Sequence, residues 1–267
     1  MLYLIATPIG NLGDMTYRAV ETLKACDAVF CEDTRRSRIL LDRYDVRKPL
    51  YPYHKFNEAE SAPKVLALLR GGKEVALLSD AGTPLISDPG AVLTAACIAE
   101  NLPFTALPGA SACLPALALS GLDTRAFYFA GFLPDKNKER AAVLEALKPL
   151  AATLLFYVPP HDLQSVLAAL YEHLGARRAA AVREITKLHE ETLRFTLGDP
   201  YPPEPRGEYV LAVEGAPAPQ NPLNALPLAE HLARYRAQGL PKKEAVKRTA
   251  KDRGIPKNEV YQIAIEE

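Results

Sequence analysis

Five short segments rich in glycine, proline and polar side chains each follow an apolar run of the kind that forms a buried strand. They span residues 7–11, 32–36, 54–58, 79–84 and 107–112. Parallel sheets bind ligands at the carboxyl ends of their strands, and glycine there lets a ligand approach backbone N–H and C=O groups closely. Any one of these segments could be an ordinary turn. Five of them at one sheet edge predict a ligand site there.

The common nucleotide and hydrolase motifs are absent from the sequence. No G-x-G-x-x-G follows the first apolar run, and neither G-x-x-x-x-G-K-[ST] nor G-x-S-x-G occurs. A standard dinucleotide site, a P-loop ATPase and a nucleophile-elbow hydrolase are therefore disfavoured.

Basic side chains gather in two stretches of a chain whose formal net charge is zero, with 32 Lys and Arg against 32 Asp and Glu. Residues 35–55 hold seven of them against Asp42 and Asp45, and residues 231–257 hold nine against Glu244 and Asp252. Such patches fit a polyanion that is contacted at defined places. Each patch could also be a solvated helix face.

The four cysteines, Cys26, Cys31, Cys97 and Cys113, form no C-x-x-C pair, and each has apolar neighbours. We expect buried, reduced thiols in a cytoplasmic protein and no metal site. No uncharged apolar run reaches ~18 residues, so we expect no transmembrane helix. The amino terminus lacks a basic stretch, and Pro8 follows its apolar run. That pattern is typical of an opening strand and not of a secretory signal.

Apolar runs alternate with helical patterns, which predicts an α/β fold with parallel, doubly covered strands. A first domain, residues 1–120, is expected to have strands at 2–6, 28–31, 50–53, 75–78 and 104–107. The pattern restarts in a second α/β domain, residues 121–215, with strands at 127–132, 153–157, 179–184, 193–197 and 209–213. Thr34 is expected to cap one helix, and Ser87 or Asp88 another.

The last 52 residues have a different composition. Residues 216–227 hold four prolines and are predicted to be a linker. Residues 228–267 are predicted to form a small basic helical segment. Its short helices, joined by a turn that contains glycine, are similar to a helix-turn-helix.

Four motifs carry a resemblance to a known family. They are ATPIGNLGD at 6–14, CEDTR at 31–35, SDAGTPLISDPG at 79–90 and PGASA at 108–112. They resemble the tetrapyrrole methylase superfamily and, within it, the branch that methylates the RNA of the small ribosomal subunit. The segment REITKLHEE at 183–191 and the carboxyl-terminal helices fit that branch too. The resemblance covers essentially the whole chain, and the 79–90 motif is its most specific part.

The resemblance implies a class III methyltransferase that uses S-adenosylmethionine, with two α/β domains that hold the cofactor in the cleft between them. It further implies a homodimer and, as product, a 2′-O-methylated ribose on a decoding-site cytidine of 16S rRNA in the small ribosomal subunit. Tetrapyrrole enzymes usually open with G-x-G-P-G, whereas this chain has TPIGN at 7–11. That departure, with the basic carboxyl-terminal segment, argues against a porphyrinoid substrate.

The family's cofactor contacts, carried over motif by motif, imply a set of residues that bind largely through backbone groups. The set is Pro8, Gly10, Asp80, Gly82, Thr83, Ile86, Ser87, Gly109, Ser111 and Ala112 from the first half of the chain, with Tyr157, Val158 and Ala212 from the second. Gly82 and Gly109 are expected to lie where a Cβ would meet the ligand.

The chemistry asks little of side chains, because the sulfonium is already activated and positioning the ribose oxygen does most of the work. The ribose hydroxyl must still lose its proton. Candidates that could accept it or lower its pKa are Asp33, His54, Lys187, His189 and Glu190. Each has an ordinary alternative: a partner for nearby arginines, a surface or core histidine, or a pair on an exposed face. The sequence leaves this choice open.

Arg35 is a candidate for holding the acceptor, because it follows a predicted strand end at the edge that carries the cofactor segments. An arginine fork can bind phosphate oxygens in a bidentate way, which would fix the ribose next to them. The alternative is that Arg35 pairs with Asp33 and only stiffens the turn.

Two other functional classes remain open from the sequence. An enzyme of the same fold could methylate a tetrapyrrole, another small molecule or a protein. A regulator that binds nucleic acid through a helix-turn-helix could also carry a ligand-sensing domain.

Overall fold

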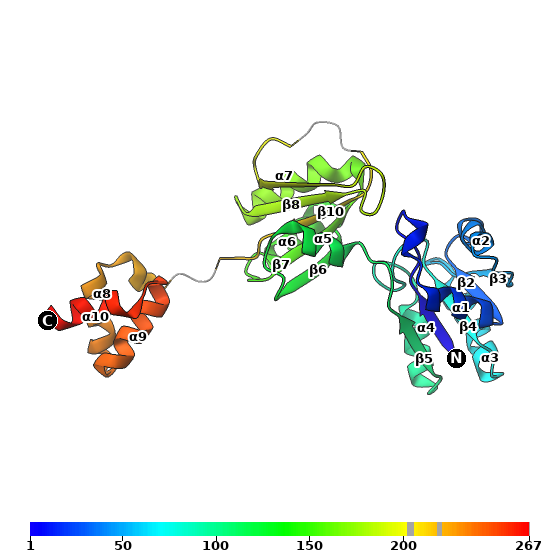
Figure 1. Cartoon of the computed structure of the whole chain (residues 1–267), viewed down its shortest axis with the longest axis horizontal. Coiled ribbons are helices and arrows are strands. Elements are labelled where there is room, and N and C mark those ends of the chain that lie inside the picture. Colours follow the sequence, from blue (N-terminus) through cyan, green and yellow to red (C-terminus); the bar gives the residue numbers. More distant parts are fainter. Residues whose placement is uncertain (202–205, 218–220, 267) are drawn as a thin grey trace. The chain divides into compact units, whose positions relative to one another are not determined.

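A computed structural model describes residues 1–201, 206–217 and 221–266 (Figure 1). The predicted linker at 216–227 therefore lies partly outside the described residues, as does the proline-rich stretch at 200–205. The chain divides into two compact units, Met1–Gly215 and Ala216–Glu267.

The first sheet is parallel throughout, with strand order β3-β2-β4-β1-β5. Its strands are β1 (Leu2–Ile5), β2 (Ala28–Cys31), β3 (Leu50–Pro52), β4 (Val75–Leu78) and β5 (Phe104–Leu107). Strands β1, β2 and β4 read as continuous apolar runs because helices cover both of their faces. This confirms the predicted parallel, doubly covered sheet.

Successive residues of these strands pack on opposite sides of the sheet, as the pleat requires. Leu4, Phe30 and Leu77 join one core with helices α3 (Glu58–Arg70) and α4 (Ala91–Ala99). Ile5, Val29 and Leu78 join another with helices α1 (Tyr17–Ala25) and α2 (Thr34–Arg43). A 3₁₀ turn, η1 (Leu12–Asp14), lies between β1 and α1. The carboxyl ends of the strands are thereby held at one edge.

Two helix starts differ from the sequence prediction. The N-cap of α2 is Asp33 and not Thr34, because the Asp33 side chain accepts the Arg35 backbone N–H at 2.8 Å. The N-cap of α4 is Gly90 and not Ser87 or Asp88. Ser87 has a left-handed backbone, so the chain is still turning there, and the Gly90 N–H is bonded to Glu58 Oε2 at 3.1 Å.

The second sheet is mixed, with order β6-β7-β10-β8-β9. Its strands are β6 (Phe127–Phe132), β7 (Thr153–Val158), β8 (Arg178–Arg183), β9 (Glu191–Thr196) and β10 (Tyr209–Val213). Only β6 and β7 pair in parallel; β10 is antiparallel to both β7 and β8, and β9 is antiparallel to β8. Each predicted strand of this half is present, with its ends shifted by at most two residues.

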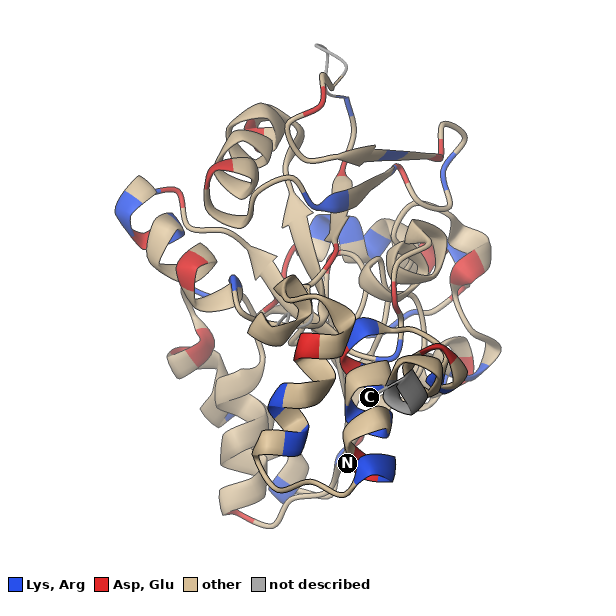
Figure 2. Cartoon of the chain, turned by 90° about the vertical axis from the view of Figure 1, so that its left-hand side faces the viewer, with Lys and Arg blue, Asp and Glu red and all other residues tan. Residues whose placement is uncertain are grey.

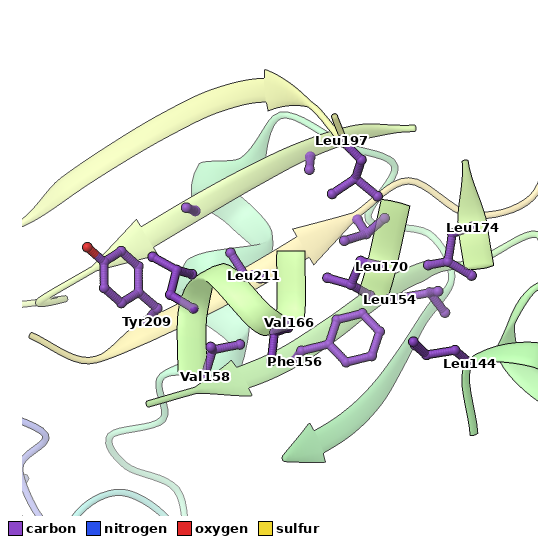
Figure 3. Close-up of a cluster of buried hydrophobic side chains, with 14 of the residues drawn as sticks. Leu144, Leu154, Phe156, Val158, Val166, Leu170, Leu174, Leu197, Tyr209 and Leu211 are labelled. Carbon is purple, nitrogen blue, oxygen red and sulfur yellow. The ribbon is translucent and has the colours of Figure 1, made fainter. Parts of the chain in front are cut away.

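Helices α6 (Asn137–Leu147) and α7 (Leu163–Leu174) cover one face of this sheet. Their leucines pack against Leu154, Phe156 and Leu211 in a core that Figure 3 shows from close by. Helix α5 (Cys113–Ser120) covers the other face and packs against β7, β8 and β10. A 3₁₀ turn, η2 (Pro160–Asp162), precedes α7. Residues 113–120 thus pack with the second sheet, although the sequence pattern groups them with the first.

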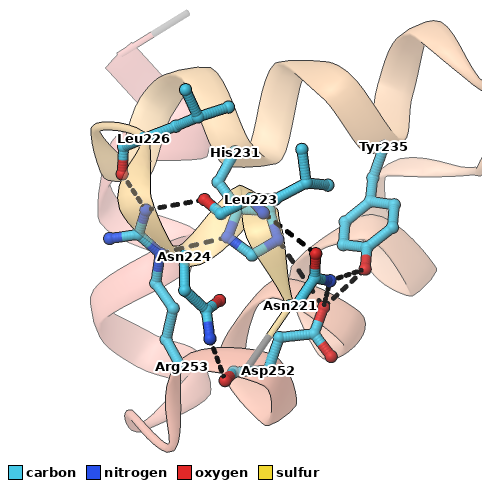
Figure 4. A network of polar contacts seen from close by, with 8 residues as sticks. All are labelled: Asn221, Leu223, Asn224, Leu226, His231, Tyr235, Asp252 and Arg253. Atoms are coloured by element: carbon cyan, nitrogen blue, oxygen red, sulfur yellow. Dashed lines mark hydrogen bonds and ion pairs between the residues drawn. The ribbon is translucent and has the colours of Figure 1, made fainter. Parts of the chain in front are cut away.

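The unit from Ala216 to Glu267 consists of short helices around a small core. They are η3 (Pro222–Ala225), α8 (Leu228–Ala237), α9 (Lys242–Arg253) and α10 (Lys257–Glu266). Leu232, Val246 and Val260 are among its buried apolar residues. Figure 4 shows a polar network inside it, in which Asp252 Oδ2 accepts from Tyr235 and from Asn221 Nδ2. Asn221 belongs to the predicted linker, so that the end of this segment is part of the folded unit.

Arg253 is internal to this unit. Its guanidinium donates to the carbonyl oxygens of Leu223 and Leu226 and to Nδ1 of the buried His231. Burial and the positive charge of Arg253 lower the pKa of His231. Across the described residues of both units, no helix is both long and apolar enough to cross a membrane.

Candidate functional site

The first unit contains a cleft of about 510 Å³ that is lined from both sheets. The first sheet contributes the loops after β1, β2, β4 and β5. The second sheet contributes the ends of β6 and β7, the start of β10 and the loop after β8. The lining is partly apolar, with Ile9, Ile86, Phe132, Val158 and Val210. Its size falls in the range of small-molecule sites.

Strained backbone is concentrated around this cleft. Leu85 and Ser87 in the loop after β4 have φ of 72° and 66°, and Glu184 and Thr186 in the loop after β8 have φ of 50° and 67°. Residues other than glycine rarely have this left-handed backbone conformation, and those that do often lie at functional sites. The strain therefore supports a binding role for these two loops.

Three carboxylates line the first-sheet side of the cleft: Glu32, Asp80 and Asp88. Burial, together with the negative charges of Glu32 and Asp80, raises the pKa of Asp88 to about 7. Burial and the charge of Asp80 also raise the pKa of Glu32. Asp80 is fixed more firmly, because it accepts the Asp33 N–H at 3.0 Å and Arg36 Nη1 at 3.1 Å. This wall is a concentration of negative charge.

Lys187 stands on the second-sheet side, between two acidic partners. Its Nζ lies 2.9 Å from Glu184 and 3.0 Å from Glu208. Burial alone would lower the pKa of Lys187, but the hydrogen bonds to these carboxylates outweigh burial, and the pKa is raised. Lys187 is thus held in its charged form, which makes it a poor acceptor for a proton.

The structure brings nine of the implied cofactor residues into this cleft. They are Asp80, Gly82, Thr83, Ile86, Ser87, Ser111, Ala112, Tyr157 and Val158. Pro8 and Gly10 instead line a neighbouring groove. Gly109 and Ala212 line neither cavity. A Cβ on Gly109 would lie 2.8 Å from Ala6 Cβ, so this glycine serves packing, and Ala212 is fully buried in the second sheet.

Gly82 is required for its backbone conformation. Its φ is +80°, and it exchanges two 2.9 Å backbone hydrogen bonds with Thr7, which join the loops after β1 and β4. A Cβ there would make ordinary contacts with Ile9 Cγ2, at 3.5 Å, and with the Ala110 carbonyl oxygen, at 3.9 Å. The strain of a left-handed residue, and not the expected steric overlap, is what selects glycine.

Of the proton-accepting candidates named from the sequence, only Lys187 lines the cleft. Asp33 caps α2 and pairs with Arg35 Nη2 at 2.8 Å, which holds the pKa of the Asp33 carboxyl well below its usual range. Arg35 is 89% exposed and lines neither cavity. His54 and Glu190 also lie outside both. Glu190 accepts the Thr186 backbone N–H, and His54 packs its ring edge-on against Phe56. His189 is likewise absent from both linings.

Sequence reasoning missed Glu32, Asp88, Glu208 and Arg36 as residues of the cleft. Glu32 and Arg36 could have been found, since both belong to a segment already expected at the site. Asp88 sits within the 79–90 motif, but its place beside Pro89 suggested a helix cap. Glu208 follows a stretch outside the described residues and carries no local signal. No group of three or more metal-ligating side chains is arranged to hold an ion among the residues described.

Comparison with known proteins agrees with this architecture. A sequence profile of the tetrapyrrole (corrin/porphyrin) methylases matches residues 1–201. The crystal structure of the methyltransferase CobJ is similar with a TM-score of 0.63 at 20% identity, covering 80% of this chain and 94% of that one. Diphthine synthase is similar with a TM-score of 0.58 at 13% identity, covering 80% and 89%.

Sequence relatives narrow the class. A protein of Mesorhizobium japonicum named ribosomal RNA small subunit methyltransferase I is 47% identical over 272 residues, covering 99% of this chain and 91% of its own. Its namesake in Bacillus subtilis (strain 168) is 43% identical, covering 98% and 92%. The chain is therefore a methyltransferase of the tetrapyrrole methylase fold. Within that class it belongs to the ribosomal RNA small subunit methyltransferase I family.

The raised pKa of Asp88 predicts a pH-dependent cost to stability. The folded state binds this proton more tightly than the unfolded chain, whose Asp pKa is about 3.9, so the associated stability is present below about pH 4 and lost as pH rises through 7. We expect Asp88→Asn to melt at a higher temperature than the native protein at pH 8. The gap should shrink toward pH 4.5 in calorimetry. The exposed Asp135→Asn is the control, and an equal gap at both pH values would contradict the assignment.

Proposed function

We propose that this protein uses S-adenosylmethionine to methylate the ribose 2′-oxygen of a decoding-site cytidine in 16S rRNA. The observation that carries the proposal is the cleft, where a carboxylate wall faces apolar side chains between two sheets. The names of the relatives support ribosomal RNA as the substrate class.

The cleft fits the proposed methyl donor in charge and shape. S-adenosylmethionine carries a fixed positive sulfonium, an adenine ring and an amino-acid end. Glu32, Asp80 and Asp88 offer negative charge, while Ile86, Val158 and other apolar residues offer a surface for the ring. When bound, the cofactor supplies an activated methyl group. The turn at 80–83, Ile86, Ser87, Ser111, Ala112, Tyr157 and Val158 are the residues we propose to hold it.

Asp88 is our proposed acceptor for the ribose proton. It lines the cleft, and its pKa of about 7 makes it an effective base near neutral pH. Asp33 is a weaker candidate, because its two oxygens already serve Arg35 and the start of α2. The charged Lys187 is suited to hold a negative group or to order Glu184 and Glu208.

The carboxyl-terminal unit is the proposed second contact with RNA. Eight of the nine Lys and Arg residues between 231 and 257 are exposed, and the ninth, Arg253, donates to a carbonyl oxygen inside the unit. Lys243, Lys247 and Lys251 are spaced four apart on α9, so they share one helix face. Basic positions are blue in Figure 2. Such a face suits a phosphate backbone.

A homodimer is also part of the proposal. Large apolar side chains are exposed on α4, where Val92 is 50% and Ile98 66% accessible, and on edge strand β6, where Phe127 and Tyr128 are 43% and 47% accessible. Large apolar side chains left exposed in this way are the residues we propose for an association surface.

The activity is tested by transfer of labelled methyl from the cofactor to small subunits, naked 16S rRNA, a protein mixture and a tetrapyrrole. We expect label in RNA, at a cytidine whose 3′-phosphodiester bond resists alkaline hydrolysis because the 2′-oxygen is methylated. Asp88→Asn should slow transfer by about 100-fold at saturating cofactor, where a weaker cofactor affinity no longer limits the rate. Label in protein or tetrapyrrole alone would instead support the other enzyme class. Cofactor binding without any transfer would favour the regulator.

The basic face of α9 is tested with the triple variant Lys243→Ala, Lys247→Ala and Lys251→Ala. The slope of log affinity against log salt is negative, and loss of three phosphate contacts should reduce its magnitude by about two for single-stranded RNA. Filter binding at several salt concentrations measures it. The matched triple Lys→Arg variant should keep the native slope. Equal slopes for all three proteins would remove this face from the RNA interface.

Association is tested by sedimentation equilibrium of the native chain and of the double variant Val92→Glu, Ile98→Glu. We expect a dimer for the native chain and a monomer for the variant, because two buried carboxylates would be unpaired in the interface. Tyr17→Glu, which changes a 92% exposed side chain on α1, should remain dimeric. A native chain that sediments as a monomer at micromolar concentration would overturn this part of the proposal.

A further inference from the structure

A second cavity of about 460 Å³ lies beside the cleft, between the loop after β1 and helix α2. Thr7, Pro8, Gly10 and Leu12 form one side of this groove, and Arg36, Ile39, Leu40 and Arg43 form the other. Ser37, Ser79 and Asp80 complete the lining. Arg36 and Asp80 line the groove and the cleft alike, so that the two cavities share a wall.

The helical side of the groove carries two arginines at its ends. Arg36 and Arg43 are seven residues apart in α2, which places them on one face about 10 Å apart along the axis. Arg36 is held by Asp80, whereas Arg43 makes no ion pair or side-chain hydrogen bond with the residues that the structure describes. Arg43 is exposed and available to a ligand.

The surface between the arginines is apolar. Ile39 is 74% exposed and Leu12 is 46% exposed, and Leu40 and Pro8 lie with them in the lining. Asp80 is the only acidic side chain of the groove, and its charge is matched by Arg36. A ligand that fits here is anionic at two separated points and presents flat or apolar groups between them. A single-stranded polynucleotide has this chemistry.

We propose that this groove binds the acceptor strand of the RNA, with Arg36 and Arg43 on two of its phosphates. The sugar nearest Arg36 would then stand at the wall that opens into the cleft. This inference rests on the proposed function and adds to it the path of the substrate. It assigns the phosphate contacts to the face of α2 that carries Arg36 and Arg43, whereas Arg35 is engaged with Asp33 through two hydrogen bonds to its side chain.

Arg43→Ala is the informative variant, because Arg43 lines the groove and not the cleft. Arg38→Ala is its matched control: Arg38 is an exposed arginine of the same helix that lines neither cavity. The probe is a fluorescent single-stranded oligoribonucleotide of about 12 nucleotides, titrated into the full chain at several salt concentrations. Cofactor affinity is measured by calorimetry in parallel.

We expect Arg43→Ala to weaken probe binding by about tenfold, as loss of a charge-assisted hydrogen bond does. The magnitude of the slope of log affinity against log salt should decrease by about 0.7, the value of one phosphate contact on a single strand. Cofactor affinity and melting temperature should match those of the native chain, and Arg38→Ala should bind the probe normally. Arg43→Lys should recover part of the affinity because it restores the charge.

Equal probe affinity and slope in Arg43→Ala and Arg38→Ala would overturn the groove assignment, whatever the enzyme methylates. Failure of the proposed function is a separate result: the native chain would transfer no methyl to RNA even though Arg43 still controlled probe binding. A probe that the native chain does not bind at low salt would also reject the groove as a nucleotide site.

Discussion

The Asp80 carboxylate is the interaction on which the arrangement of the site depends. One oxygen accepts the backbone N–H of Asp33 at the end of β2, and the other accepts the guanidinium of Arg36 in α2. The side chain is only 20% exposed, so water competes weakly for these bonds. Asp80 follows the end of β4, so its bond to Asp33 connects the ends of the neighbouring strands β2 and β4. Asp80 also lines both cavities.

Around this anchor the protein gathers features that oppose stability. Three carboxylates share the first-sheet side of one cleft, and two loops hold left-handed residues that are neither glycine nor asparagine. Such features persist where the surrounding structure fixes them. Here the support comes from two sheets that are each packed on both faces by the apolar sides of helices.

Much of the fold could be predicted from the sequence because its strands are buried. Runs such as Val75–Leu78 and Tyr209–Val213 are apolar at every position, which favours buried strands, and the structure has strands at these residues. The pairing partner of helix α5 could not be predicted, since its apolar residues would suit either sheet. Local signals also misplaced two helix caps, because side-chain direction depends on backbone turns such as that at Ser87.

The site was predicted less well than the fold, and the reason is geometric. The sequence predicts which loops lie at the site, because the ends of the apolar strands show where each loop begins. Which side chain of a loop faces the cavity depends on local hydrogen bonds that composition does not report. Asp33 turns back onto α2 and Arg35, while its neighbour Glu32 faces the cleft. The sequence predicts Asp88 only as a helix cap, because its burial near Glu32 and Asp80 depends on the fold.

The polar network of the carboxyl-terminal unit has an evolutionary consequence. Asn221, His231, Tyr235, Asp252 and Arg253 join its segments through directional contacts, so the small apolar core is not alone in specifying the fold. Arg253 is the one Lys or Arg among these five residues. The lysines on the outer face of α9 are therefore free to be gained, lost or moved by mutation. The surface charge of this unit can therefore change while the scaffold that presents it stays the same.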